Sequence, residues 1–473
     1  MNQRHFLILT ASFLLSACML GEDYKQPTFF TQQQVEDSLA LKPVQNPDKI
    51  PFHPLEFHDP TLEILLKNGI QNAPTLRSAL MKLRQSRESL RIQEASLFPS
   101  MDASTKYNYV NESKNMGYMV EEDYYMAGLD MNWEIDIFGG TRRRIESAKA
   151  NQTASIENLK NVYVSLVAEI TNNYVQLRTT EELLKQAQNN LQIQKDMYQL
   201  TLDKYETGLT NAINLNQAHY QLETTKASIP QLEYQQTSLQ NALALLVGEL
   251  PGALNKILAQ NKKNLIQQPF RYQIDKLYEL PADIIRKRPD VRVQEEQLIA
   301  QNALVGAAIA EMFPSVNLSG LLGFESLKFP KLFNHNSYSY SYVPELTTPI
   351  FHFGALYNNV QLQKSLKEEK MIAYEQSLLT AAQEIKNALV SIDKEINRNS
   401  ALNQAYQKMS QAAHLTREKY QSGLIEYSQV LDAEERRINA QTDLINSNGS
   451  LYQNIVTFYK SIGGEFSLDT KNN

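Results

Sequence analysis

The chain has 473 residues, and its 52 acidic side chains outnumber its 46 basic ones, for a net charge of −6. This balance argues against a nucleic-acid partner. Cys18 is the only cysteine, which excludes an intramolecular disulfide and a CxxC metal site. After residue 17, no apolar run approaches the roughly 20 residues of a membrane-spanning helix, so a bilayer could be crossed only by strands.

The N-terminus has the features of a secretory signal. Arg4 and His5 precede an apolar run over residues 6–15, which predicts a signal peptide at 1–17. Leu15-Ser16-Ala17-Cys18 resembles the bacterial lipobox, which implies diacylglycerol and an N-acyl chain on Cys18. Met19, rather than Asp, follows that cysteine and favours the outer membrane. The alternative is a lone cysteine in an ordinary signal. Residues 18–59 are then a lipidated N-terminal arm, and we expect no other cofactor.

The rest of the sequence contains the same set of landmarks twice. KYETGLT at 204–210 returns as KYQSGLI at 419–425, and Pro74 with Pro289 and Phe138-Gly139 with Phe353-Gly354 keep the same offset of 215 residues. Because turn-forming residues match at a constant distance, the sequence predicts an internal duplication. We assign repeat 1 to 60–248, a linker to 249–280, repeat 2 to 281–463 and a polar tail to 464–473.

Each repeat contains two segments of strand periodicity, at 99–110 and 124–138 and again at 314–326 and 337–351. Apolar and polar residues alternate along them, as in SYSYSY at 337–342. With Tyr107, Trp133 and Phe351 as interfacial aromatics, the pattern is typical of outer-membrane strands. Two soluble hairpins with one dry face are the alternative. Pro344 removes a ladder donor and fits only an edge strand or a bulge.

Long helices follow each strand pair. Residues 141–207 and 355–422 contain neither Pro nor Gly, which predicts helices about 100 Å long with coiled-coil packing. Shorter helices at 74–97 and 289–312 lead into the strands. One seam steps by three and four: Ile156, Leu159, Tyr163, Leu166, Ile170, Asn173, Leu177, Thr180, Leu184, Ala187 and Leu191.

Glycines mark where the long helices end. Gly208 and Gly423 supply the left-handed residue of a helix-ending turn, with hairpin tips at 207–211 and 422–426. Return helices run to 248 and 463, and Pro230 should kink the first of them. Four strands cannot close a barrel, which needs about eight, so the chain must oligomerise.

At this point the residues resemble the TolC family of outer-membrane efflux ducts, and within it the lipoprotein branch that is OprM-like, CmeC-like or NodT-type. The resemblance rests on GEDYKQP at 21–27, RPDV at 289–292, FPSVNLSGLLGFES at 313–326, PIFHFG at 349–354 and the two Y-x-x-G turns, the second followed by YSQVLDAE. It covers nearly the whole chain.

The resemblance implies a mainly helical fold with membrane strands. Three protomers would form a 12-stranded β-barrel on an α-barrel of long coiled-coil hairpins. It also implies a homotrimer in the outer membrane of a Gram-negative bacterium, a periplasmic adaptor and an inner-membrane RND-type transporter. The duct would be a passive conduit for drugs and other small toxic compounds, not an enzyme.

Carried over to this chain, the resemblance assigns a periplasmic gate to Asp432, Tyr420 and Lys419. Three copies of Asp432 would form a cation-attracting ring, although Asp432 could instead merely face solvent. Lys419 stands where many relatives have Arg. Gln217, in the repeat position of Asp432, and Ser428 also depart from the family pattern.

The tip residues Gly208, Leu209, Gly423 and Leu424 would contact the adaptor. Arg142, Arg143 and Arg144 follow the second strand, where they could meet lipid phosphates or form a solvated charge run.

Two other functions stay open at this stage. One is a lipid-anchored trimeric coiled-coil protein with a structural or adhesive role, and the other is a type I protein-secretion duct. The absence of a Met or His cluster favours drugs and detergents over copper or silver as cargo.

Overall fold

The computed structural model describes residues 19–41, 57–111, 115, 121–260, 265–267, 277–278, 280–281 and 283–464. The expected signal peptide, the Cys18 lipidation site and the tail after residue 464 lie outside this range.

The element order repeats once along the chain. The first repeat contains α4 (Pro74–Ala95), β1 (Ser100–Asn111), β2 (Glu121–Ile135), α5 (Gly140–Glu206) and α6 (Ala212–Val247). The second contains α10 (Pro289–Ala310), β3 (Ser315–Ser326), β4 (Tyr338–Thr347), α11 (Ala355–Gln421) and α12 (Tyr427–Ser461). The shorter α-helices are α2 (Gln32–Leu39), α3 (Pro60–Asn72), α7 (Asn255–Gln260) and α9 (Ile284–Lys287). The predicted fold class, long helices with four strands in two repeats, is confirmed.

The chain forms two compact units. The first includes the described residues up to 27 together with 81–156 and 292–376, and it holds the sheet. The second includes residues from 28 to 80, 157–291 and 377 onward, and it holds the helical hairpin tips. Because α5 and α11 are so long, each contributes residues to both units.

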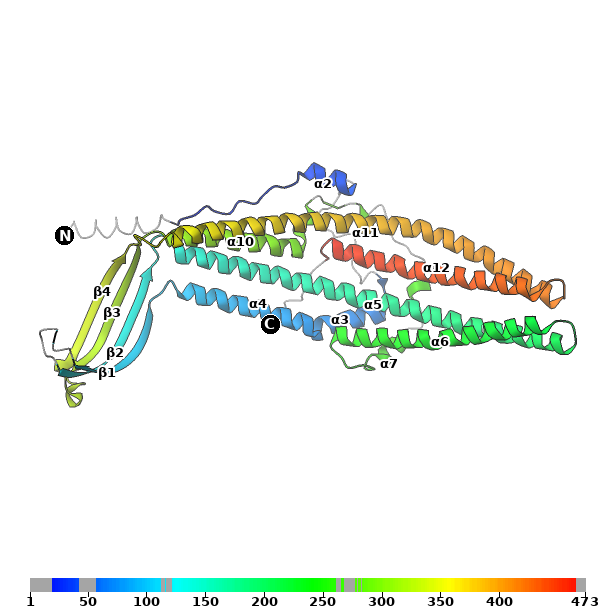
Figure 1. Ribbon diagram of the computed structural model, residues 1–473, viewed down its shortest axis with the longest axis horizontal. Helices are drawn as coiled ribbons and strands as arrows, with labels where there is room; N and C mark the ends of the chain where they lie inside the picture. The colour runs from blue at the N-terminus through cyan, green and yellow to red at the C-terminus, as the bar shows by residue number, and fades with distance from the viewer. Residues whose placement is uncertain are drawn as a thin grey trace. The chain divides into compact units, whose positions relative to one another are not determined.

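The four strands form one antiparallel sheet in the order β1-β2-β3-β4 (Figure 1). Its register places the predicted apolar positions on one face: one row across the sheet runs Ala103, Leu129, Leu322 and Tyr340, and another runs Thr105, Ala127, Phe324 and Tyr338. The polar residues of the same strands share the other face, as the pairs Asp102 with Asp130 and Glu134 with Asn317 show. The alternation read from the sequence is therefore the two-faced pattern of this sheet.

Two strands end earlier than predicted. β2 stops at Ile135 rather than at 138, because the Asp136 carboxylate accepts hydrogen bonds from the main-chain N–H groups of Thr141 and Arg142 and turns the chain into α5. β4 stops at Thr347 rather than at 351, just before Pro349, which has no N–H to donate. Pro344 lies in β4, an edge strand, as expected.

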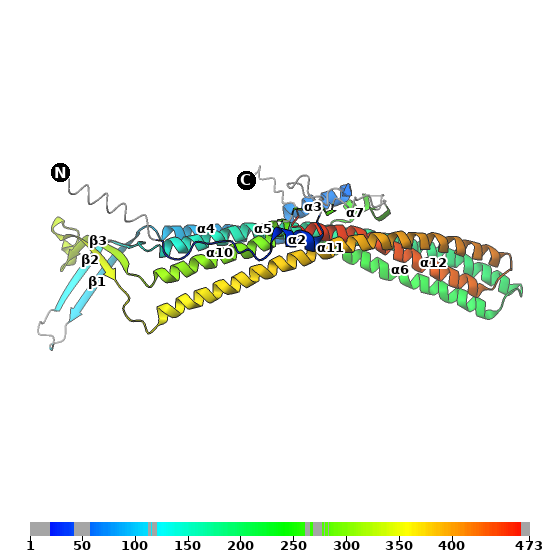
Figure 2. The same ribbon diagram turned by 90° about the horizontal axis from the view of Figure 1, so that it is seen from above.

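The helices match their predicted ranges within about two residues. Both long helices run without a break for 67 residues. Pro230 lies inside α6, which continues through it from Ala212 to Val247. In both views, α6 returns along α5 and α12 returns along α11 (Figures 1 and 2). Among the described residues, the helices lack any stretch apolar enough to serve as a membrane span.

The predicted seam of α5 is mostly buried between residues 159 and 180 and only half-buried beyond residue 180. Leu159, Tyr163, Leu166, Ile170 and Leu177 are buried. Leu184, Ala187 and Leu191 are only half-buried, whereas Gln186, Asn190 and Gln194 are buried instead. Toward the tip, the face that α5 buries within the protomer is therefore mainly polar.

Candidate functional site at the hairpin tips

Both hairpin tips are closed by the same backbone motif. After α5, the Leu209 N–H donates to the Lys204 carbonyl oxygen and the Gly208 N–H donates to that of Tyr205. After α11, Leu424 donates to Lys419 and Gly423 to Tyr420 in the same way. This is the Schellman arrangement, in which a residue of positive φ ends the helix. Gly208 and Gly423 both have φ +74°, so the sequence prediction for these glycines holds.

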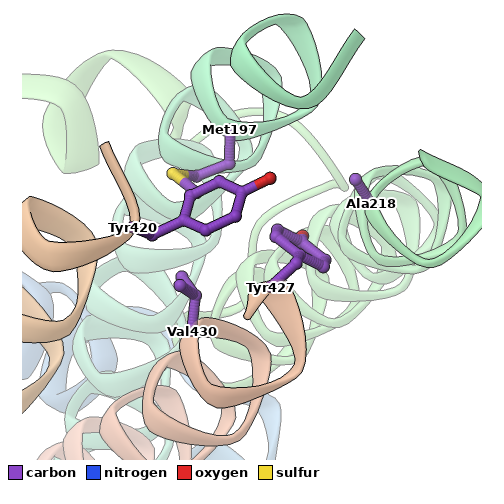
Figure 3. Close-up of a cluster of buried hydrophobic side chains, with 5 residues drawn as sticks. All are labelled: Met197, Ala218, Tyr420, Tyr427 and Val430. Atoms are coloured by element: carbon purple, nitrogen blue, oxygen red, sulfur yellow. The ribbon is translucent and has the colours of Figure 1, made fainter. Parts of the chain in front are cut away.

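The described part of the tip has a small core to which all four long helices contribute. Met197 of α5, Ala218 of α6, Tyr420 of α11, and Tyr427 and Val430 of α12 are buried together. Figure 3 shows their side chains pointing toward one another. The Tyr420 and Tyr427 rings meet edge to face with centroids 5.5 Å apart, a favourable aromatic geometry. The two hairpins are thus packed together close to their turns.

Tyr420 is the centre of this packing. Its side chain is only 3% exposed, and its hydroxyl lies 3.2 Å from the Thr201 hydroxyl of α5. The Lys204 ammonium lies over its ring at 4.3 Å from the centroid and donates to the Tyr420 carbonyl oxygen. Lys419, named from the sequence as a gate residue, has an exposed side chain. The cation that contacts the Tyr420 ring is therefore Lys204, the counterpart of Lys419 in the first repeat.

A buried ionic network lies one turn further from the tip. The Glu434 carboxylate is 3.0 Å from the Arg417 Nε of α11 and 2.8 Å from the Arg437 Nε of its own helix. Arg437 also donates to the Asn190 side-chain oxygen of α5 at 2.8 Å. Glu434 and Arg437 are both buried. A chain of charged and polar groups therefore joins α11, α12 and α5.

Asp432 lies on a different face of α12. Its carboxylate is exposed and forms an ion pair with Arg436, one turn along the helix, at 3.0 Å. Ser428 is also exposed. Gln217, the repeat counterpart of Asp432, is half-buried, and its side-chain oxygen has no hydrogen-bond partner among the described residues. The tip thus separates a buried cluster around Tyr420 from an exposed carboxylate at Asp432.

Hydrophobic periodicity misses the polar half of this site. The Gln186 amide donates to the Ile438 carbonyl oxygen at 3.2 Å and to the Thr442 hydroxyl at 3.3 Å. Together with Asn190 and Thr201, it forms a polar stripe on α5 that faces the second hairpin. The sequence does carry a signal, because Gln186, Asn190 and Gln194 repeat every four residues, but apolar patterns do not detect it.

Burial changes the acidity of Tyr427. Loss of hydration, with the nearby Tyr420 and Glu434 groups adding to it, raises the pKa of Tyr427 to about 12. The phenol therefore stays neutral in the folded protein.

The three consecutive arginines are internal ion-pair partners rather than a free basic run. In the sheet-containing unit, Arg142 pairs with Asp136 at 3.2 Å and Arg144 pairs with Glu311 at 2.7 Å. Arg143 is 1% exposed, pairs with Glu146 at 2.7 Å and donates to the carbonyl oxygens of Leu20 and Gly21. Both expectations, a lipid contact and a solvated run, are wrong for Arg143, which instead holds the N-terminal arm.

Comparison with known proteins identifies the class of molecule that carries these features. A family model described as outer membrane efflux protein matches residues 65–249 and 280–464. The two matched segments start 215 residues apart and cover both repeats. The chain belongs to the outer membrane efflux protein family.

Relatives of this efflux protein match along nearly their whole length. The toluene efflux pump outer membrane protein TtgC of Pseudomonas putida is 28% identical over 97% of this chain and 94% of its own. The cation efflux system protein CusC of Escherichia coli is 26% identical over 98% of this chain and 99% of its own. The solved structure of the outer-membrane channel OprN is 29% identical, with a TM-score of 0.85 over 95% of this chain and 99% of that chain.

These matches give the protein its class and location. It is an outer-membrane efflux channel of the TolC-like fold and not an enzyme. The alternative of an anchored structural or adhesive rod is therefore set aside.

Proposed function

We propose that this efflux protein is the exit duct of a tripartite pump and works as a homotrimer. The observation that carries the proposal is the open sheet: among the described strands, β1 and β4 each pair on one side only. Unpaired edges of 12 and 10 residues are unfavourable in a membrane unless another strand covers them. In an antiparallel order, β4 of one protomer can pair with β1 of the next, and three sheets then close a 12-stranded barrel.

The tips support docking of a periplasmic adaptor. Leu209 and Leu424 follow the two capping glycines and are 76% and 72% exposed. Apolar side chains on matching turns offer a repeated contact for a helical partner. An adaptor held there would link the duct to an inner-membrane RND-type transporter, and export would then pass through the trimer without any covalent step.

Asp432 is proposed as the cation-attracting group of the closed gate. In a trimer its three copies would meet near the axis, and Arg436 offsets part of their mutual repulsion. Channel recording tests this role. Asp432→Asn should lower cation selectivity by up to about fivefold, and Arg436→Gln should raise it. Equal selectivity in all three proteins would remove Asp432 from the gate.

We also propose lipidation at Cys18. The arm after it is held by Arg143 and by Gln26, whose side chain donates to Glu295 at 2.7 Å. The residues that follow Cys18 lie at the start of α5: Met19 packs against Gly139, and the Leu20 N–H donates to the Phe138 carbonyl oxygen. Mass spectrometry of the N-terminal peptide distinguishes lipidation from an unmodified cysteine.

The proposed cargo is drugs and other small toxic compounds. Relatives are named for toluene and for cation efflux, so the class of cargo has to be measured for this chain. Cells that lack their own channel but retain the adaptor and pump provide the test. Expression should lower accumulation of a hydrophobic dye and raise antibiotic tolerance. Rescue of silver or copper tolerance alone would favour cation export, and rescue of neither would contradict the proposal.

A further inference from the structure

The connection between β3 and β4, residues 327–337, combines exposed aromatic and basic side chains. Phe329 and Phe333 are 62% and 72% exposed, while Leu332 between them is buried and anchors the segment. Two short turns shape it, Phe329–Lys331 and His335–Ser337, and the Ser337 hydroxyl donates to the Lys331 carbonyl oxygen at 2.7 Å. The segment is therefore folded and presents its aromatic rings outward.

The aromatic rings continue the apolar face of the sheet. Phe329 contacts the Tyr125 ring edge to face at 5.5 Å, and Phe333 contacts Phe324 in the same manner at 5.8 Å. Tyr125 and Phe324 both lie on the apolar face defined by the register. Phe329 and Phe333 are therefore placed at the end of that face, where aromatic side chains suit the boundary between hydrocarbon and headgroups.

The same segment carries two lysines. Lys328 precedes the first turn and Lys331 is its last residue, and the Lys331 N–H donates to the Lys328 carbonyl oxygen at 2.9 Å. Residues three apart lie close together in such a turn. Both side chains are exposed, and within the described chain neither forms an ion pair. Two neighbouring cations without a counter-charge suit an anionic ligand.

We propose that residues 327–337 bind the phosphorylated headgroup of an outer-leaflet glycolipid. Phe329 and Phe333 would enter the acyl boundary, and Lys328 and Lys331 would bind the phosphates. The inference rests on the proposed function, in which the apolar face meets lipid and the helices are periplasmic. Since β2 leads directly into α5, the β3–β4 connection lies at the opposite, outer end of the strands (Figure 1).

Native mass spectrometry of the full-length, detergent-extracted protein tests this site with bisphosphorylated lipid A as the probe. The Lys328→Gln/Lys331→Gln variant should bind it about 30-fold more weakly, since each lysine near a charged lipid surface contributes about a fivefold effect. Lys364→Gln/Lys367→Gln makes the same change at the same spacing on α11 and should bind like the parent. Dephosphorylated lipid A should show no difference between these proteins.

Substitution of Phe329 and Phe333 gives an independent test of the same site. Phe329→Ser/Phe333→Ser should weaken binding of both lipid A forms, because it removes apolar contacts rather than charge. If the lysine variant binds bisphosphorylated lipid A as the parent does, or if the α11 control loses as much, the headgroup site is wrong. The same spectra report subunit number. A trimeric parent with unaltered lysine-variant binding would refute this site alone, whereas a monomeric parent would refute the proposed function.

Discussion

The Lys204 ammonium lies over the Tyr420 ring, 4.3 Å from its centroid, and so joins the end of α5 to the end of α11. Lys204 and Lys419 are equivalent in the two repeats, yet only Lys204 makes this contact, while Lys419 faces solvent. The two hairpins of one protomer are therefore linked asymmetrically at their tips, although their turns are alike.

This asymmetry gives the first prediction. Lys204→Gln should loosen the tip by about 1 kcal/mol, the usual size of a partly desolvated cation–π contact. Hydrogen exchange should then speed up at residues 197–208 and 418–430. Lys419→Gln is the matched control and should leave both segments unchanged. Equal exchange in the two variants would show that the Lys204 contact does not stabilise the tip.

The second prediction concerns the buried carboxylate. Glu434→Gln removes the counter-charge of Arg437, which is buried, and of Arg417, which is partly exposed. Breaking a buried pair from one side costs about 3 kcal/mol, so the thermal unfolding midpoint should fall by several degrees. Glu435→Gln, at the exposed neighbouring position, should have little effect. A stable Glu434→Gln protein would mean that the arginines find other partners.

The third prediction is a pH dependence at the tip. The pKa of Tyr427 is raised from 10.0 to about 12 in the folded protein. As pH rises above 10, the unfolded chain ionises this phenol while the folded chain keeps it neutral, so stability falls until about pH 12. Tyr427→Phe lacks the phenol and should lose less stability between pH 9 and 12 in denaturant titrations. Identical slopes would contradict the burial of Tyr427.

The fourth prediction concerns strand spacing in the sheet. A Cβ at Gly323 would lie 2.5 Å from the Gly128 Cα, whereas one at Gly320 would meet its nearest atom at 3.4 Å. Gly323→Ala should therefore destabilise the sheet by about 1–3 kcal/mol, and Gly320→Ala by less. Resistance of the purified assembly to heating in detergent compares the two. Equal resistance would indicate that β2 and β3 can move apart at little cost.

Much of the fold could be predicted because its signals are local. The alternation of serine and tyrosine at 337–342 predicts that the tyrosines of β4 share one face. Gly208 and Gly423 predict the two turns, because the conformation of a turn depends on its own residues. The ends of the strands are harder to predict from the sequence. β2, for example, ends where the Asp136 carboxylate accepts hydrogen bonds from the first N–H groups of α5.

The site itself depends on contacts between distant positions. The Lys204–Tyr420 contact joins residues more than 200 apart, and no pattern within one helix indicates it. Gln186 and Asn190 are buried because their partners on α12 satisfy them, which hydrophobic periodicity cannot show. From the sequence alone, Arg143 looks like a surface charge, because its partners, the carbonyl oxygens of Leu20 and Gly21, are more than 120 residues away.

The central claim is that the open sheet of one chain is completed by two further copies. The native mass of the lipidated, detergent-extracted protein tests it most directly, by light scattering or native mass spectrometry. The account predicts three chains per particle. A folded particle of one chain would contradict it, because β1 and β4 would then have to keep their edges uncovered in the membrane.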